Sequence, residues 1–307
     1  MNRFTGDRVT FGMALMTRRR FLWSSAALGV GAAGAAGYAV GIEPCWERVE
    51  RRTLKLRGLP SAWSGRRLVQ LSDLHAGPRV SGAYLRDAIG KLPALGPDVV
   101  AVTGDWVTMH DALPDAALDD MLSVLTATTI ERGVPVVACL GNHDYGSTWR
   151  DQALADALTE RLVSAGVQVL RNQAVAIDGL VFAGVGDLWS DEFRATRAID
   201  AAKALEAYEE ERDLVVLCHN PDSLRQPDFD EGRWSGVVLG GHTHGGQCKF
   251  PLLGRPMLPV RHREYAAGWF DLSSTRKLYV NVGLGHSHRV RFGVRPEVTV
   301  FELAGAS

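Results

Sequence analysis

The chain has 307 residues, of which 46% are hydrophobic and 22% charged, so it can bury a sizeable core and is not intrinsically disordered. The formal net charge of −1 is divided unevenly. Residues 1–42 hold five Arg and one Asp, and the remaining residues hold 29 Lys and Arg against 34 Asp and Glu. A mildly acidic globular part argues against general nucleic-acid binding, and we expect no nucleic-acid partner.

The N-terminal segment has the pattern of an export signal. Three arginines, Arg18 to Arg20, precede Phe21-Leu22 and an uncharged, Ala- and Gly-rich stretch from Trp23 to Ile42. The arginine pair, the Phe-Leu step and the weakly hydrophobic run resemble a twin-arginine signal, which implies the twin-arginine export machinery as a partner. About 20 residues are also enough to span a bilayer.

The charge pattern gives this segment an orientation. Arginines before an apolar stretch stay on the cytoplasmic side, so the chain that follows should cross the membrane. We therefore expect residues 1–42 to be a signal or membrane anchor and residues 43–307 to form an exported domain. Cleavage at Ala33-Gly34-Ala35 would release the domain, and the sequence leaves open whether it occurs.

Cysteine usage excludes two kinds of site. The four cysteines, Cys45, Cys139, Cys218 and Cys248, include no CxxC spacing, so neither a zinc ribbon nor a thioredoxin-like motif is supported. Cys139 and Cys218 lie within apolar runs and are typical of small core residues. Whether any of the four form a disulfide stays open.

From Glu43 onward the sequence alternates between strand and helix patterns. Short apolar runs predict strands at 53–56, 68–71, 98–102, 134–140, 167–170, 174–177, 180–185, 214–217, 237–239, 278–282 and 298–303. Capped or amphipathic stretches predict helices at 81–92, 114–132, 149–165 and 195–211. No repeat or linker follows residue 45. The alternation favours a single α/β domain with a largely parallel core, and the closing strands suggest a second sheet packed on the first.

Five of these strands end in residues that can bind a metal. In chain order they are Asp73 and His75, Asp105, Asn142 and His143, His219, and His242 with His244. Ligand sites in α/β folds gather at the carboxyl ends of strands. Each motif alone is common as a plain turn, but five in this order, each at a strand end, are hard to explain as turns.

The residue types indicate which metals would bind. Two carboxylates, one amide oxygen and four imidazoles are too many ligands for one tetrahedral zinc. They suit two metals about 3.5–4 Å apart that share a bridging carboxylate. Nitrogen and oxygen ligands without thiolate favour manganese, iron or zinc over magnesium or calcium. We therefore expect two divalent metal ions as cofactors.

Together these motifs resemble the signature of the calcineurin-like metallophosphoesterases, from about Leu68 to Gln247. The motifs are Asp73-x-His75, Gly104-Asp105, Gly141-Asn142-His143-Asp144, His219 and Gly241-His242-x-His244. The twin-arginine start, Ile42-Glu43-Pro44 and Gly283-Leu284-Gly285 make the chain similar to the exported, membrane-associated bacterial branch, the YkuE- and YaeI-like phosphodiesterases.

The resemblance implies a fold and a ligand set. The fold is a four-layer α/β/β/α sandwich, with two central mixed sheets flanked by helices. One metal would be held by Asp73, His75, Asp105 and His244, and the other by Asp105, Asn142, His219 and His242. His143 would be a catalytic residue outside the metal ligands, facing the phosphate. The family often carries Asp or Asn where this chain has Thr108, which puts the orientation of Asp105 in question.

The resemblance also implies a function. We expect a binuclear metal-dependent phosphoesterase that hydrolyses phosphodiesters or phosphomonoesters with a metal-bridging hydroxide. It would work at the outer face of the cytoplasmic membrane or in the periplasm, at the membrane surface, on a free or lipid-linked phosphoester. The alternatives are a pyrophosphatase acting on a nucleotide-linked lipid precursor, as in UDP-diacylglucosamine hydrolysis, and a non-catalytic metal-binding envelope protein.

Two segments after the predicted ligands have a second interpretation. His286-Ser287-His288-Arg289 contains another His-x-His without accompanying carboxylates, which favours a solvated or substrate-rim loop over a third metal site. Five basic residues surround a Pro-rich loop: Lys249, Arg255, Arg261, His262 and Arg263. That loop is either simply solvated or a rim that meets phosphate or lipid headgroups.

Overall fold

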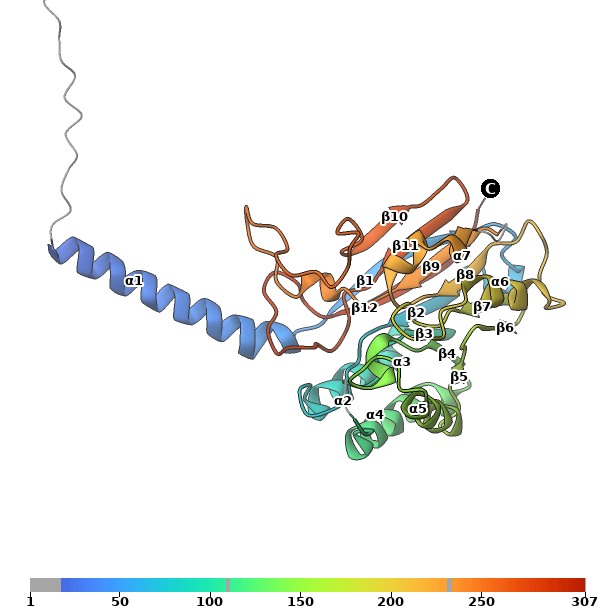
Figure 1. Cartoon of the computed structure of the whole chain (residues 1–307), viewed down its shortest axis with the longest axis horizontal. Coiled ribbons are helices and arrows are strands. Elements are labelled where there is room, and N and C mark those ends of the chain that lie inside the picture. Colours follow the sequence, from blue (N-terminus) through green and yellow to red (C-terminus); the bar gives the residue numbers. More distant parts are fainter. Residues whose placement is uncertain (1–17, 109–110, 231–233, 307) are drawn as a thin grey trace, which may run out of the picture. The chain divides into compact units, whose positions relative to one another are not determined.

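The computed structural model describes residues 18–108, 111–230 and 234–306 (Figure 1). The chain divides into two compact units between Tyr38 and Ala39. In the first unit, helix α1 (Arg18–Gly37) presents exposed apolar side chains, among them Leu22 and Trp23. It begins a helical stretch, Arg18–Cys45, that is long and apolar enough for a signal or a membrane span.

The N-terminal predictions are only partly covered by the structure. Residues 1–17 of the predicted signal segment lie outside the described residues. The predicted boundary after Ile42 stays a prediction.

The second unit is built on two six-stranded mixed sheets. The first has the order β1 (Arg48–Leu56), β12 (Glu297–Gly305), β2 (Arg67–Leu71), β3 (Val99–Thr103), β4 (Val136–Cys139) and β5 (Gln168–Val169). The second has the order β10 (Gly268–Asp271), β11 (Arg276–Val280), β9 (Gly236–Gly240), β8 (Leu214–Leu217), β7 (Leu180–Gly184) and β6 (Gln173–Ile177). Strands β2 to β5 run parallel in the first sheet, and β7, β8, β9 and β11 do so in the second.

The continuous apolar runs arise because both faces of each sheet are covered. In β3, Val99 and Ala101 point into the core between the sheets, while Val100 and Val102 point toward the helices. This alternation follows from the two-residue period of a strand. An apolar residue at every position is therefore what a strand buried on both faces requires.

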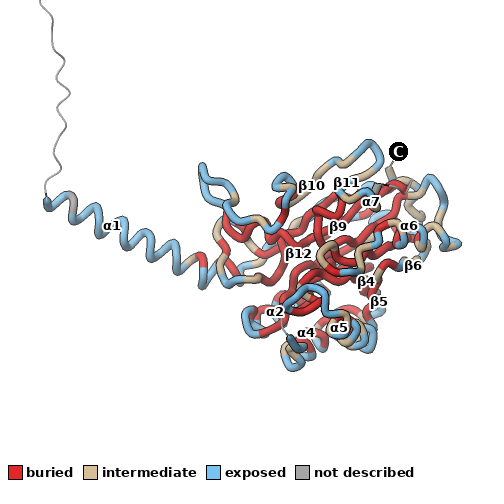
Figure 2. The backbone as a smooth tube through the Cα atoms, in the orientation of Figure 1, coloured by how far each residue is buried: buried red, intermediate tan, exposed pale blue. Residues whose placement is uncertain are grey.

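Helices complete the outer layers (Figures 1 and 2). The first sheet is covered by α2 (Gly82–Gly90), α3 (Leu92–Leu95), α4 (Asp115–Thr128) and α5 (Gln152–Ser164), and the second by α6 (Ala195–Lys203) and α7 (Pro227–Asp230). The predicted α/β/β/α sandwich is confirmed.

Several elements differ from their predicted bounds, and three differences are instructive. Helix α6 ends at Lys203, not near Glu211, because acidic residues accumulate where the negative end of the helix dipole would lie. Helix α5 begins at Gln152 because the Asp151 carboxylate accepts a hydrogen bond from the backbone N–H of Leu154 and caps the helix. Strand β10 was not predicted, since its four residues show no alternation.

The two sheets are joined by aromatic packing around Phe301. This side chain is fully buried between the sheets, with ring centroids 5.1 Å from Tyr279 and 5.8 Å from Trp269. Its neighbour Glu302 points to solvent from the same strand.

We predict that Phe301→Ala lowers the free energy of unfolding by about 3–5 kcal/mol, because it leaves a cavity between the sheets. Glu302→Ala, one position along the strand, should change it by less than about 0.5 kcal/mol. Equilibrium denaturation in urea measures both. Equal effects of the two substitutions would show that Phe301 does not bear on inter-sheet packing.

Candidate functional site

The carboxyl ends of strands from both sheets meet at one edge of the sandwich. Strands β2, β3 and β4 lead to Asp73, Asp105 and Asn142, while β8 and β9 lead to His219 and His242. All the predicted site residues are buried except His143, which is half-buried. The structure therefore brings together side chains that are up to 171 residues apart in the sequence, from Asp73 to His244.

Close approach of the strand ends depends on two glycines. A Cβ atom on Gly104, whose φ is +85°, would lie 2.7 Å from the backbone nitrogen of Gly141 and 2.7 Å from Nδ1 of His219. A Cβ atom on Gly141 would collide with the Asp105 carboxylate. Glycine at both positions lets the ends of β3, β4 and β8 converge.

The backbone at the site is strained. Asp73, His75, Asp105, His242 and His244 are five of the ten non-glycine residues with positive φ in the described chain. Left-handed backbone costs roughly 1–3 kcal/mol for such residues, and it clusters at functional sites. Here it turns each side chain away from the strand direction and into a shared centre.

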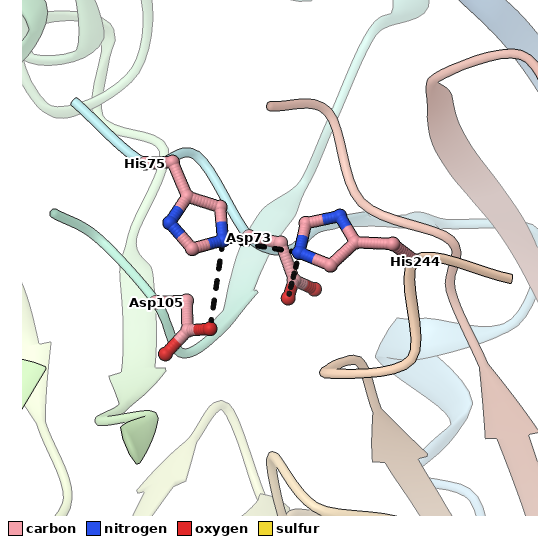
Figure 3. Close-up of side chains that lie close together, drawn as sticks. All are labelled: Asp73, His75, Asp105 and His244. Carbon is pink, nitrogen blue, oxygen red and sulfur yellow. Dashed lines mark hydrogen bonds and ion pairs between the residues drawn. The ribbon is translucent and has the colours of Figure 1, made fainter. Parts of the chain in front are cut away.

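One group of potential metal ligands comprises Asp73, His75, Asp105 and His244 (Figure 3). The Nε2 atoms of His75 and His244 face each other at 3.0 Å. Nε2 of His244 lies 3.3 Å from Oδ1 of Asp73, and Nε2 of His75 lies 3.6 Å from Oδ2 of Asp105. Two nitrogens bound to one metal at about 2.1 Å stand about 3 Å apart, so this spacing fits a shared ion.

A second group shares Asp105 and adds His219 and His242. Nε2 of His219 lies 3.2 Å from Oδ2 of Asp105 and 3.3 Å from Nδ1 of His242. Both polar side-chain atoms of Asn142 are buried here without a hydrogen-bond partner. A buried amide without a partner is unfavourable, so Asn142 is suited to contribute its oxygen to a ligand in this group.

Hydrogen bonds outside the two groups orient the imidazoles. Nδ1 of His219 donates to the carbonyl of Thr103 at 2.7 Å, which turns Nε2 toward the Asp105 carboxylate. Although burial opposes it, this carboxylate raises the pKa of His219 well above its ordinary value. Nε2 of His242 donates to the carbonyl of Pro259 at 3.2 Å, which leaves Nδ1 facing His219. In the neutral imidazoles, the form that binds a metal, the tautomers that these bonds select turn a ring-nitrogen lone pair into the centre.

Burial also sets the protonation of the site. It lowers the pKa of His242 to about 3 and lowers the pKa values of His75 and His244 well below the usual value. These imidazoles are therefore neutral, the form that binds metals. Burial would raise the pKa of Asp105, but the adjacent His219 and His143 hold it well below its ordinary value.

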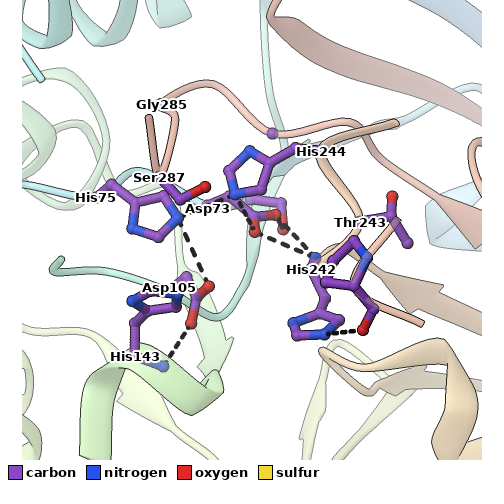
Figure 4. A network of polar contacts seen from close by, with 12 residues as sticks. Asp73, His75, Asp105, His143, His242, Thr243, His244, Gly285 and Ser287 are labelled. Carbon is purple, nitrogen blue, oxygen red and sulfur yellow. Dashed lines mark hydrogen bonds and ion pairs between the residues drawn. The ribbon is translucent and has the colours of Figure 1, made fainter. Parts of the chain in front are cut away.

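His143 lies beside the two groups rather than within them (Figure 4). Its ring contacts that of His75 edge-on, with centroids 4.8 Å apart, and its backbone N–H donates to Oδ1 of Asp105 at 2.9 Å. Burial lowers the pKa of His143. The residue follows Asn142 in the short 3₁₀ turn Asn142–Tyr145, which separates its side chain from that of its neighbour.

Three further residues lie near the centre, and sequence reasoning missed one of them, Asp187, while it assigned no site role to the other two. Asp187 follows β7, is buried with one carboxylate oxygen unpartnered, and has a pKa that burial raises to about 6. Trp189 packs edge-on against His242 with ring centroids 4.6 Å apart. Asp144 accepts hydrogen bonds from the backbone N–H groups of Gly141 and Val107. The signal for Asp187 was available, since Gly-Asp after a buried strand is the pattern that identified Asp105.

Three open questions from the sequence have structural answers. Thr108 donates a hydrogen bond to the carbonyl of His75 at 3.1 Å, so it supports the turn of β2 rather than orienting Asp105. His286 is hydrogen-bonded through Nε2 to the carbonyl of Arg79 and belongs to neither group of potential ligands found in the described chain. The four cysteines are free thiols.

Comparisons with known proteins agree with this geometry. The family model for calcineurin-like phosphoesterases matches residues 66–246, which contain every predicted site residue. The chain is 33% identical to Phosphodiesterase YaeI of Escherichia coli (strain K12), covering 94% of this chain and 100% of that protein. It is 30% identical to the uncharacterized metallophosphoesterase YkuE of Bacillus subtilis (strain 168), covering 95% and 99%. It is 28% identical to UDP-2,3-diacylglucosamine pyrophosphatase LpxG of Chlamydia trachomatis serovar D, covering 84% and 89%.

We predict that Asp105→Asn weakens metal binding by both groups, because both include this carboxylate. His219→Ala should weaken binding by one group only, and Asp98→Asn, at the far end of β3, should leave binding unchanged. The measurement is the metal content per chain of each of the three variants, determined by mass spectrometry after dialysis. Two tightly bound metals in Asp105→Asn would mean that this carboxylate is not shared.

Proposed function

Because the chain belongs to the calcineurin-like phosphoesterase family, we propose that it is a binuclear metal-dependent phosphoesterase acting on phosphodiesters or phosphomonoesters. The observation that carries the proposal is the placement of Asp105 in both groups of potential ligands. A carboxylate common to two adjacent groups suits a pair of ions about 3.5–4 Å apart.

The donor atoms fit two divalent ions. We assign Asp73, His75, Asp105 and His244 to one, and Asp105, Asn142, His219 and His242 to the other. These nitrogen and oxygen ligands, with no thiolate among them, favour manganese, iron or zinc. When bound, such ions would lower the pKa of a coordinated water so that it can act as the nucleophile near neutral pH, and would offset the charge of the phosphoryl oxygens.

The protein's own residues position the reacting groups. The backbone N–H of His143 holds Oδ1 of Asp105 at 2.9 Å and so fixes the shared carboxylate. We assign the half-buried His143 side chain a contact with the phosphate, through which it would stabilise the transition state or protonate the leaving oxygen.

We further propose that the domain works outside the cytoplasm. Helix α1 carries three arginines at its start and exposed apolar side chains along its length, as a signal or anchor requires. Export of folded protein by the twin-arginine route would allow metal to be loaded before crossing. Activity would then lie at the outer face of the cytoplasmic membrane or in the periplasm.

A pyrophosphatase is the second candidate, favoured by the 28% identity to LpxG. Trp149, which is 37% exposed, packs at a tilt against Trp189 with ring centroids 4.7 Å apart, and this pair beside His242 offers an aromatic surface for a nucleotide base. Location separates the candidates, because a nucleotide-linked lipid precursor is cytoplasmic. A non-catalytic metal-binding protein is disfavoured, since such proteins usually lose a ligand and this chain keeps all seven.

The activity is tested with bis(p-nitrophenyl) phosphate and p-nitrophenyl phosphate. Metal-loaded protein should hydrolyse one or both, and chelation followed by dialysis should abolish turnover that added manganese then restores. Absence of turnover with every metal and ester would reject the proposed function.

We predict that His143→Ala keeps both metals but lowers turnover roughly 10²–10⁴-fold, because its contact forms mainly in the transition state. His143→Gln, which retains a hydrogen-bond donor, should recover part of the loss if stabilisation dominates. Comparing p-nitrophenyl with poorer leaving groups separates the roles, since proton donation matters less for a good leaving group. Metal loss in His143→Ala would instead make it a ligand.

We predict that Arg18→Lys combined with Arg19→Lys retains folded, metal-loaded protein in the cytoplasm, because the arginine pair is the element that the export machinery reads. Arg20→Lys is the matched control and should be exported. Cell fractionation with immunoblotting distinguishes the outcomes, and normal export of the double variant would defeat the twin-arginine route.

A further inference from the structure

An apolar groove of about 630 Å³ opens beside the metal centre. One wall is the segment Pro256–Pro259 and the other comprises Ser287, His288 and Val290. The volume lies within the range of pockets that hold a small organic ligand. A groove with apolar walls beside a centre built for phosphate suits a ligand with an apolar part and a phosphate.

The groove begins at the centre itself. Thr243 and His244 line it, and His244 is one of the proposed ligands. The opposite wall is tied to the other group, because the carbonyl of Pro259 accepts the hydrogen bond from Nε2 of His242. A ligand lying in the groove would therefore place one end next to the metals.

The groove walls are held by hydrogen bonds. The Gln247 side-chain amide donates to the carbonyls of His288 and Val290, both at 2.7 Å. Its oxygen accepts from the hydroxyl of Ser287 at 2.9 Å. A Cβ atom on Gly246, whose φ is +74°, would lie 2.5 Å from the carbonyl of Met257, so glycine permits the close approach of this wall. The groove is thus part of the ordered fold.

The segments that form the walls are strongly basic. Residues 248–263 and 286–296 contain seven Lys and Arg and no Asp or Glu, although residues 43–307 as a whole are acidic. Among these cations Lys249, Arg263 and Arg289 are exposed. Such a surface is complementary to the anionic headgroups of a membrane.

A hairpin next to the groove, residues 250–254, presents two exposed leucines. Phe250 and Gly254 exchange backbone hydrogen bonds of 2.8 and 3.0 Å, and the Leu252 and Leu253 side chains at the tip are 107% and 79% exposed. Phe250 stacks on Phe292 with ring centroids 5.3 Å apart. Exposed leucines on a hairpin flanked by two cations, Lys249 and Arg255, are typical of a segment that enters a lipid interface.

The same region receives the start of the domain. The Glu43 carboxylate accepts hydrogen bonds from the backbone N–H groups of Gly293 and Val294, at 2.9 and 2.6 Å. The carbonyl of Ala39 accepts one from the backbone N–H of Arg291 at 2.9 Å. The domain therefore begins beside the segment that walls the groove. An anchor preceding Ala39 would hold this end of the domain toward the bilayer.

We propose that the groove binds the acyl chain of a membrane lipid whose phosphoester lies at the metal centre. This inference rests on the proposed function and names its substrate class. The basic rim meets the headgroup layer, the leucines of the hairpin enter the interface, and the chain passes along Met257 and Val290 toward His244. Both candidate activities, on a phosphoester or on a lipid-linked pyrophosphate, are compatible with a groove that binds an acyl chain.

The test uses full-length protein and a series of alkyl p-nitrophenyl phosphates, from methyl to octyl, below their micelle concentrations. All have the same leaving group, so differences in kcat/KM report the chain alone. Burial of a methylene is worth up to roughly threefold to fourfold. We expect kcat/KM to rise at least about tenfold from the butyl to the octyl ester.

Two variants should reduce the increase of kcat/KM with alkyl chain length. Met257→Asp places a charge at the groove mouth, and its side chain is 63% exposed, so folding should be unaffected. Val290→Trp fills the groove. Val163→Asp is the matched control, because Val163 is 55% exposed on α5, outside the groove, and it should keep the full chain-length dependence.

Each outcome has one meaning. If kcat/KM of the wild type does not change with alkyl chain length, or if it rises equally in all variants, the proposed acyl-chain site is wrong. A flat series together with concentration-dependent dimers in light scattering would assign the groove to a second copy of the chain. If no ester is hydrolysed, the proposed function fails separately, and calorimetric binding of octyl phosphate against methyl phosphate still decides whether the groove takes a chain.

A second experiment tests whether the acyl chain comes from a lipid bilayer. With a hexadecyl ester in phosphatidylglycerol vesicles, Leu252→Asp combined with Leu253→Asp should lower turnover about tenfold relative to that on the monomeric octyl ester. An unchanged ratio would mean that the ligand does not come from the bilayer.

Discussion

The structure depends on burying two carboxylates and four imidazoles together. Burial of charged groups is unfavourable unless hydrogen bonds or counter-charges compensate it. Backbone donors provide part of the compensation, since the N–H of His242 bonds to both oxygens of Asp73 and that of His143 bonds to Asp105. The ion pairs that the structure records for these carboxylates are with histidine. Cations held by these residues would complete the balance, and stability and metal binding would then be coupled in this fold.

The same requirement explains the unusual backbone. A strand that ended in ordinary extended geometry would carry Asp73 and His75 past the centre, whereas left-handed turns fold them back into it. The parallel strands that surround the site place their carboxyl ends at one edge. The fold therefore supplies the convergence, and the strained turns supply the final orientation.

Much of this was predictable from the sequence, because strands buried on both faces are continuous apolar runs and parallel strands align their ends. Other features have no local signal. Strand β12 lies between β1 and β2 and so joins segments far apart in the chain, and no residue pattern near Glu297 predicts this placement. Asp187 was missed because Gly-Asp usually marks a plain turn. The groove could not be predicted from the sequence, because Met257, Leu258 and Pro259 follow no helix or strand periodicity. Only the basic residues around them indicated a possible binding rim.

The free thiols bear on the proposed export of the protein in its folded state. Burial raises the pKa of Cys218 to about 12 and that of Cys139 well above the usual value, so neither thiol is ionised or reactive. A chain that crossed unfolded would expose all four cysteines to an oxidising compartment, where mispaired disulfides form. A chain that folds before crossing has already enclosed these two within its sheets. Resistance to oxidation would then come from the order of events, folding first and translocation second, rather than from any pairing of sulfurs.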